Sequence, residues 1–407
     1  MLQILKKITS LINVDFMAVF FSIMIIANST FEIDVNLYVV PKVLIFIFFV
    51  MMSVVIFLNI KNREPLYCKA IAFPVVFFAW ETLSLIWSVD KSYSLFKWTT
   101  QAQIFLLFLF VYYYMRTKGS LKTFLTATYI SGYALLFYTI YRYGLSYVLD
   151  AMSKSVRLGG LINNENIYGL VFASAILVAF YWITQKKSKL HIISIVLFTF
   201  FALSSGSKKA VVMIVAGIMG ISILAYGFRR LWKVFLVLAI LFAGIMIVVN
   251  TGLFPSIVDR FESFFSGNLN SGDRNREMFR QAGLELILKR PSLGYGLSSY
   301  AKVSGFGVYS HDNFIEIGVG NGVIGLILYY LPWVYSAVFM MRGFFEKKSD
   351  CLILFILIML YIVMGVGYVQ FDTRGVWILW AVSLALIDKE VNSTNAVKKI
   401  TERDMKL

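Results

Sequence analysis

Apolar stretches of about 20 residues recur along the whole 407-residue chain, and they constrain the fold more than any other feature. A helix needs about 20 apolar residues to cross the hydrocarbon core of a bilayer. Hydrophobic residues make up 59% of the sequence and charged residues 15%, whereas soluble domains are about half apolar and about a quarter charged. We therefore expect an all-α polytopic membrane protein, with residues 1–407 forming a single integral membrane domain.

The sequence contains twelve such apolar segments. They span residues 11–31, 37–58, 66–88, 95–115, 121–143, 162–183, 190–205, 209–227, 231–250, 313–341, 351–369 and 375–388. No small-residue cleavage site follows the first segment, so we interpret it as a retained membrane helix. The ninth and tenth segments are separated by residues 251–312, a connection of about 60 residues. Connections of this length are usually functional, and we expect an external loop with short amphipathic helices that carries part of the active site.

Lysine and arginine residues accumulate in alternate connections between these segments. Cytoplasmic loops of membrane proteins carry an excess of both residues. If Lys6 and Lys7 lie in the cytoplasm, five successive even-numbered connections each hold three positive charges, and the first external loop holds none. This pattern predicts twelve spans with both termini inside. The net charge of +16 is then mostly a topology signal, and we do not expect nucleic acid as a partner.

Several positive charges fall in connections that this topology places outside, where the membrane does not require them. They are Arg157, Lys208, Lys209, Arg274, Arg276, Arg280, Lys289, Arg290 and Arg374. His311, one of only two histidines, lies on the same side. Part of the long loop, residues 274–289, has the pattern of an amphipathic helix. Its predicted apolar stripe consists of Met278, Phe279, Ala282 and Leu286.

The motif RLGGLINNENIYG joins an external connection to a predicted helix. Its glycines allow close approach of another backbone, and Asn164 and Asn166 offer amides at the membrane edge. The guanidinium of Arg157 could bind an anionic ligand. The alternative interpretation is a polar helix start, in which the asparagines cap the helix and Arg157 meets a lipid phosphate.

Two further basic motifs suit a diphosphate. Lys208 and Lys209 stand at a predicted helix N-terminus, where free N–H groups and the helix dipole attract anions. Arg274, Arg276 and Arg280 carry guanidinium forks, which bind phosphate oxygens in pairs. Each motif has an alternative interpretation. The two lysines could extend to lipid headgroups, and the three arginines could belong to an interfacial helix that lies on anionic lipid.

The segment VYSHDNFIEIG places His311 beside Asp312, with Glu316 one turn later at the start of a helix. An imidazole with an ordinary pKa takes up a proton near neutral pH, so His311 is a candidate general base. Negative charge at a helix start is favoured by the dipole. The alternative is a histidine that is hydrogen-bonded to backbone at the helix start.

Motifs of several other enzyme classes are missing from the sequence. It has no Gly-rich phosphate loop followed by Lys-Ser/Thr, no Cys/His cluster and no His-Glu-x-x-His. No Asp-x-Asp occurs in an outer loop. We therefore expect neither a metal site nor a cofactor.

Taken in order, these segments resemble the O-antigen ligase/polymerase superfamily, whose members are bacterial membrane glycosyltransferases that act on undecaprenyl-diphosphate-linked glycans. The matching positions are Arg157 and Gly160, Asn164 and Asn166, Lys208 and Ala210, Arg274 or Arg276, Phe279, Pro291, Gly294 and Gly296, and His311, Asp312, Glu316, Gly322 and Gly325. In three places the chain departs from the family pattern. Lys208 replaces an arginine, Phe279 a tryptophan and Asp312 an asparagine.

The resemblance implies a GT-C-like fold and an inverting, metal-independent glycosyl transfer on the external face of the bacterial cytoplasmic membrane. The donor is an undecaprenyl-diphosphate-linked oligosaccharide, and membrane lipid surrounds the protein. His311 is then the catalytic base, supported by Asn164, Asn166, Asp312 and Glu316. The expected diphosphate-binding residues are Arg157, Lys208, Lys209, Arg274, Arg276 and Arg290.

Two acceptors fit this chemistry. A polymerase extends a second lipid-linked glycan, and a chain-length regulator protein is then a candidate partner, whereas a ligase uses lipid A-core. We prefer the polymerase because nothing marks a lipid A-core site. A flippase or exporter is the third alternative, but it should show internal repeats and cations at the membrane midplane.

Overall fold

The computed structural model describes residues 14–32, 34, 36–59, 69–154, 156–159, 164–227, 231–267, 271–346 and 349–404. Within these ranges every regular element is a helix, and they contain no strand. The all-α class expected from the apolar segments is therefore confirmed. Lys6, Lys7 and Gly160 lie outside the described residues.

Each of the twelve predicted apolar segments overlaps one long helix. These helices are α2 (Val14–Phe31), α3 (Val39–Asn59), α4 (Ala72–Ser84), α5 (Lys91–Thr117), α6 (Leu121–Tyr143), α8 (Glu165–Gln185), α9 (Lys189–Ser204), α10 (Lys208–Tyr226), α11 (Leu231–Thr251), α15 (Asn313–Phe345), α16 (Ser349–Met364) and α17 (Arg374–Asp404). Among the residues described, six of them are long and apolar enough to cross a membrane, namely α3, α5, α6, α8, α10 and α15. The number of spans and their orientation stay predictions.

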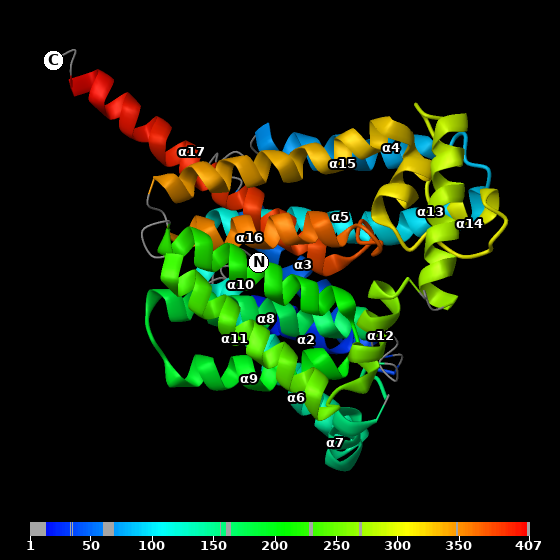
Figure 1. Ribbon diagram of the computed structural model, residues 1–407. Coiled ribbons are helices and arrows are strands. Elements are labelled where there is room, and N and C mark those ends of the chain that lie inside the picture. The colour runs from blue at the N-terminus through cyan, green and yellow to red at the C-terminus, as the bar shows by residue number, and fades with distance from the viewer. Residues whose placement is uncertain are drawn as a thin grey trace.

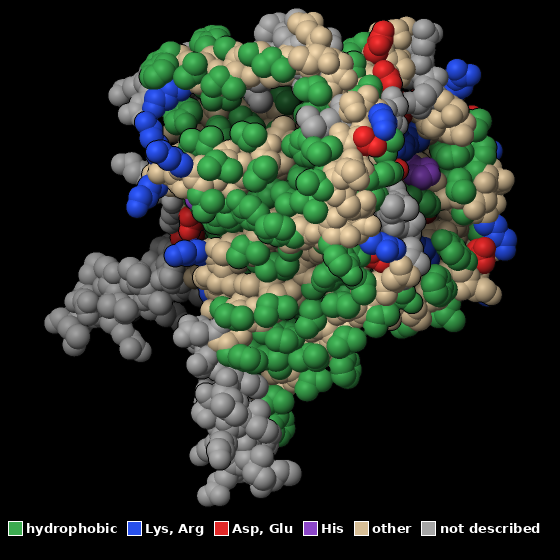
Figure 2. Space-filling view, turned by 90° about the horizontal axis from the view of Figure 1, so that it is seen from below, with side chains coloured by type: hydrophobic (Ala, Val, Ile, Leu, Met, Phe, Trp, Pro, Cys, Tyr) green, Lys and Arg blue, Asp and Glu red, His purple; other side chains and the backbone are tan. Residues whose placement is uncertain are grey.

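The long helices lie side by side as a bundle whose flank is apolar (Figure 1). Figure 2 shows hydrophobic side chains covering this flank, with Lys and Arg gathered toward its two ends. Phe46, Phe137 and Val196 are each 65% exposed, which is expected for side chains that face lipid. Helix α8 forms part of the interior, since every side chain from Phe172 to Ala179 is buried.

Four further helices cover one end of the bundle, and three of them are short. They are α7 (Leu145–Ser153), α12 (Pro255–Phe265), the 19-residue α13 (Ser271–Lys289) and α14 (Tyr300–Val303). Helix α13 crosses this end at a steep angle to the long helices (Figure 1). The last three come from the connection of residues 251–312, so the prediction of short helices in this loop is confirmed.

Helix α13 approaches α15 closely because Gly283 carries no side chain. A Cβ atom at Gly283 would lie 2.2 Å from Cγ2 of Ile315. The Tyr300 hydroxyl donates to the Phe279 carbonyl at 2.7 Å and fixes the same contact. Met278, which we expected on the apolar stripe, is 46% exposed. That part of the prediction is wrong, because the buried face of α13 is centred on Phe279 and Gly283.

Helix α15 is interrupted at Gly322, whose backbone has φ 69° and ψ −173°. A Cβ atom there would lie 2.1 Å from the Ser292 carbonyl oxygen, so only glycine allows the loop after α13 to pack at this point. The Tyr295 and Gly296 N–H groups donate to the carbonyls of Val319 and Gly320, each at 2.8 Å. These contacts attach the loop to the first half of α15.

Candidate active site

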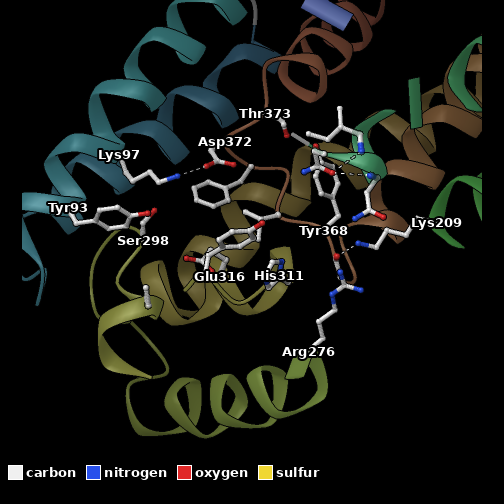
Figure 3. Close-up of a pocket in the computed structure, with 18 residues that line it drawn as sticks. Tyr93, Lys97, Lys209, Arg276, Ser298, His311, Glu316, Tyr368, Asp372 and Thr373 are labelled. Atoms are coloured by element: carbon white, nitrogen blue, oxygen red, sulfur yellow. Dashed lines mark hydrogen bonds and ion pairs between the residues drawn. The ribbon is translucent and has the colours of Figure 1, made fainter. Parts of the chain in front are cut away.

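A cavity of about 220 Å³ lies at the end of the bundle covered by α13 (Figure 3). Its lining side chains come from the starts of α5, α8, α10 and α15, from α13, and from the connections that precede α15 and α17. They are Tyr93, Lys97, Asn164, Asn166, Ile167, Lys209, Arg276, Ser298, Ala301, Tyr309, His311, Glu316, Gly367, Tyr368, Val369, Phe371, Asp372 and Thr373. Because helix N-termini carry partial positive charge, this convergence favours an anionic ligand.

His311 lies in the turn immediately before α15, with its backbone in the left-handed region at φ 58°. Histidine tolerates this region better than most residues, and such backbone strain clusters at functional sites. The Ser310 hydroxyl donates to the Asp312 carbonyl at 2.8 Å and stabilises the turn. The imidazole packs against Tyr309 and Phe279, with ring centroids 4.1 Å and 6.1 Å away. It makes no hydrogen bond to any residue that the structure describes, so its nitrogens are available to a ligand.

The surroundings of His311 disfavour the imidazolium form. Burial and the positive charges of Arg276 and Lys209 lower the pKa of His311 to about 4. The expectation of a near-ordinary pKa is therefore wrong. The imidazole is neutral at pH 7, the form that accepts a proton.

Lys209 and Arg276 form the positively charged side of the pocket, which we call the cationic side (Figure 3). The Lys209 ammonium donates to the Gly367 carbonyl. The Arg276 guanidinium lies 3.3 Å from the Asp273 carboxylate, and its side chain is 33% exposed. Both cations keep N–H groups for a further acceptor, since a lysine offers three and an arginine five.

Lys208 points away from the pocket although it precedes Lys209. Its ammonium lies 2.7 Å from the Asp273 carboxylate and 4.9 Å from the centre of the Phe264 ring. Burial opposes ionisation of Asp273, but Lys208, Arg276 and Arg260 together lower the pKa of this carboxyl below its usual range. The Lys208–Asp273 pair therefore attaches α13 to α10, while Lys209 faces the cavity.

Arg157 lies beside this group without lining the cavity. Its Nε donates to the Ser205 carbonyl at 2.9 Å, and Nη1 lies 3.5 Å from the Glu165 carboxylate. Burial, with the charges of Arg260 and Arg276, lowers the pKa of Arg157, although an arginine stays charged. The buried Nη2 of Arg157 and Nε of Arg260 have no hydrogen-bond partner in the described part of the chain. Arg260, on α12, is a member of this cluster that sequence reasoning missed.

Arg274 and Arg290 are exposed and do not line the cavity. The Arg290 guanidinium lies over the Tyr295 ring at 4.7 Å. Of the two arginines proposed on the first turn of α13, the structure brings only Arg276 into the pocket.

Asn164 and Asn166 hold the start of α8. The Asn164 side chain accepts from the Asn166 and Ile167 N–H groups at 3.0 Å and 3.2 Å, as a helix cap does. The Asn166 side chain accepts from the Ser207 hydroxyl at 3.0 Å and so connects α8 to the turn before α10. These bonds fit the capping alternative, and both residues still line the cavity.

Asp312 and Glu316 have different surroundings. Asp312 caps α15 by accepting from the N–H groups of Phe314 and Ile315, and its other oxygen lies 3.4 Å from Arg280. That second oxygen also accepts from the Gly367 N–H at 3.3 Å. Glu316 is buried, accepts from the Ser310 N–H at 2.8 Å and lines the cavity. Asp312 is thus fully engaged in the fold, whereas Glu316 reaches the site.

The opposite side of the cavity contains residues that sequence reasoning missed. The Lys97 ammonium lies 3.1 Å from the Asp372 carboxylate, beside Tyr93 (Figure 3). Asn313 accepts from the N–H groups of Gln370 and Phe371, each at 2.9 Å, and so positions the segment that carries Asp372. One signal was available, because Lys97 is a positive charge on the side that the predicted topology places outside.

Residues 193–330 match the family model described as O-antigen ligase. The matched region runs from α9 into α15 and contains Lys209, Arg276 and His311. No curated protein matches the chain. The match confirms the resemblance to the O-antigen ligase/polymerase superfamily, and with the apolar helices it supports an integral membrane protein of surface-polysaccharide biosynthesis.

Proposed function

We propose, from this resemblance and from the pocket around His311, that the chain is an inverting, metal-independent glycosyltransferase. It transfers a glycan from undecaprenyl diphosphate to a hydroxyl of an acceptor glycan. The observation that carries the proposal is that His311 shares one cavity with Lys209 and Arg276. A proton acceptor and cations for a leaving diphosphate are the two functions that this transfer requires.

The reaction forms one bond and breaks one bond at the anomeric carbon of the donor sugar. The acceptor oxygen attacks this carbon while its proton passes to His311. The bond between the carbon and the diphosphate oxygen breaks, and the diphosphate leaves with the electron pair. Negative charge on that oxygen grows as the bond breaks, so Lys209 and Arg276 stabilise the transition state more than the bound donor.

The low pKa of His311 couples base strength to donor binding. Burial is the largest cause of this low pKa, and Arg276 and Lys209 add to it. A bound diphosphate would place negative charge next to the same two side chains and offset their part of the lowering. His311 would then be a stronger base with donor bound than without it.

The orientation follows from the positive-inside pattern of the sequence. We propose twelve spans with both termini in the cytoplasm, and a pocket that opens on the external face of the bacterial cytoplasmic membrane. The residues that line the cavity lie at the end of the bundle where α12, α13 and α14 are placed (Figure 1), and this is the end that the pattern assigns to the outside. Arg157 and Arg260 are proposed as further stabilising charges around the diphosphate.

We propose polymerisation of surface-polysaccharide repeat units as the physiological reaction, which a chain-length regulator would limit. Ligation to lipid A-core is the second candidate, because the matched model carries the description O-antigen ligase. A flippase is disfavoured, since the cations of the pocket, Lys209 and Arg276, lie at one end of the bundle rather than at mid-depth.

Purified protein in lipid nanodiscs, given lipid-linked repeat unit alone, tests these alternatives. Longer glycans and released undecaprenyl diphosphate would support the polymerase. A requirement for added lipid A-core would support the ligase. No release of undecaprenyl diphosphate with either acceptor would contradict the proposed transferase.

A further inference from the structure

The two sides of the cavity differ in charge. Lys209 and Arg276 lie on the cationic side, and Tyr93, Lys97, Ser298 and Asp372 lie on the other, which we call the ion-pair side (Figure 3). His311 and Glu316 lie between them (Figure 3). We propose that the ion-pair side binds the acceptor sugar, an inference that rests on the function proposed above.

Charge excludes the diphosphate from the ion-pair side. The single ammonium of Lys97 is paired with Asp372 at 3.1 Å, and the buried carboxyl group of Glu316 lies nearby. A diphosphate would therefore meet carboxyl groups rather than free cations, whereas the cationic side offers Lys209 and Arg276. Like charges in a partly buried site repel strongly, because solvent screens them poorly.

The same groups suit the hydroxyls of a neutral sugar. Lys97 and Asp372 are 28% and 23% exposed, so both reach the cavity while they remain paired. An ammonium has three donors and a carboxylate about four acceptor sites, and the ion pair uses only part of them. Tyr93 and Tyr309 are 40% and 46% exposed and present aromatic rings to the same space. Binding sites of this kind combine aromatic walls with a few placed polar groups.

The ion-pair side is built before any ligand binds. The Ser94 hydroxyl donates to the Leu297 carbonyl at 2.5 Å and attaches the start of α5 to the loop that carries Ser298. Gln101 donates to the Phe371 carbonyl at 3.3 Å, and Asn313 holds the same segment from α15. A site whose walls are already fixed loses less entropy on binding.

Reaction geometry gives the same assignment. In an inverting displacement the acceptor oxygen approaches the anomeric carbon from the side opposite to the leaving diphosphate. With the diphosphate against Lys209 and Arg276, the acceptor sugar occupies the ion-pair side. Its attacking hydroxyl then lies near His311, which is between the two sides (Figure 3).

A purely structural ion pair is the competing interpretation. Partly exposed ion pairs typically contribute little to stability, so such a role predicts small effects on unfolding and none on ligand affinity. Binding measurements with two separate probes distinguish the interpretations. One probe is the repeat-unit oligosaccharide that mild acid releases from the cells' own lipid-linked pool, and the other is undecaprenyl diphosphate.

We expect Asp372→Ala to weaken oligosaccharide binding at least about tenfold, the loss of one charge-assisted contact. Tyr93→Ala should also weaken it, because it removes an aromatic wall of the site. Undecaprenyl diphosphate should bind these variants within about twofold of wild type. Arg276→Ala should show the reverse pattern. The exposed pair Lys154–Asp150, 2.8 Å apart on α7, provides the matched control, and Asp150→Ala should change neither affinity.

Unchanged oligosaccharide affinity in both Asp372→Ala and Tyr93→Ala would overturn the assignment. So would an equal loss of affinity for both probes. Because these are binding measurements, the acceptor site can stand even when the transfer assay fails. A protein that binds the oligosaccharide at Asp372 but releases no undecaprenyl diphosphate would contradict the proposed transferase alone.

Discussion

The imidazole of His311 packs against the ring of Tyr309, with their centroids 4.1 Å apart, inside a cavity that also contains Lys209 and Arg276. The aromatic contact removes water from one side of the base. Burial, together with the two neighbouring basic side chains, lowers the pKa of His311 to about 4 and keeps the imidazole neutral at pH 7. This relationship links the proposed donor site to the base.

His311→Gln should lose at least about a hundredfold in transfer rate, the low end of the contribution that acid–base catalysis makes. Glutamine keeps hydrogen bonding but cannot take the acceptor proton. The matched control is His191→Gln, because His191 lies near the start of α9 and its Nδ1 is 3.3 Å from the Tyr129 hydroxyl. Initial rates with lipid-linked oligosaccharide measure both. Near-normal polymer from His311→Gln would remove this residue from the chemistry and leave Glu316 as the next candidate base.

The pH profile should report the lowered pKa of His311. The base acts when neutral, so kcat/KM, which reflects the free enzyme, should fall as pH drops through about 4. The midpoint for kcat should lie at higher pH, since bound diphosphate offsets Arg276 and Lys209. Arg276→Ala should shift the kcat/KM midpoint upward, because it removes one cause of the lowering. A midpoint near 6.5 in both profiles would show that neither burial nor the two cations lower the pKa of the base.

Arg276→Ala should lower kcat/KM by roughly ten- to hundredfold, because losing a charge-assisted contact costs about 1.5–3 kcal/mol. Arg274→Ala is the matched control, since Arg274 is exposed, lies on the same helix turn and does not line the cavity. We expect it to retain activity within about twofold. Equal losses in both variants would indicate that α13 acts through its overall charge rather than through one guanidinium.

Asp312→Asn should leave both stability and transfer nearly unchanged, because asparagine caps a helix as well as aspartate does. The second oxygen becomes an amide NH2, so the contact with Arg280 and the long 3.3 Å bond from the Gly367 N–H are lost; both are weak compared with the cap, since Arg280 is 41% exposed. Asp312→Ala removes the cap and should cost about 0.5–2 kcal/mol. Thermal unfolding of the detergent-purified variants compares them. A large loss in Asp312→Asn would mean that its negative charge, and not its cap, is required.

Much of the fold was predictable because membrane helices can be recognised in a sequence by their length and apolar composition. Each predicted segment overlaps a long helix for this reason. The contacts of α13 were harder to predict. The pattern around Met278 was apolar enough for a buried stripe, yet packing follows Gly283, where a missing side chain lets Ile315 approach.

The site was only half predictable. His311 and Lys209 were identified because the positive-inside pattern does not explain them on the side that the predicted topology places outside. Lys97 breaks the same rule but lies within an apolar segment, so its charge was overlooked. Asp372 pairs with it across 275 positions of sequence, and only the packing of α5 against α17 brings the two helix starts together. Arg260 could not be predicted for the same reason, since its neighbours in space, Arg157 and Arg276, belong to distant parts of the sequence.

An external site requires that the protein is oriented in the membrane with both termini inside, and cysteine labelling tests this orientation. Ser271, at the start of α13, and Glu346, just after α15, are both exposed, and Figure 1 shows α13 at one end of the bundle and the C-terminal end of α15 at the other. In a background with Cys68 and Cys351 replaced, a membrane-impermeant maleimide on intact spheroplasts should label Ser271→Cys and leave Glu346→Cys unlabelled. Labelling after membrane disruption should reach both and serves as the control. The reverse pattern on intact spheroplasts would place the pocket in the cytoplasm, where the external transfer proposed here cannot occur.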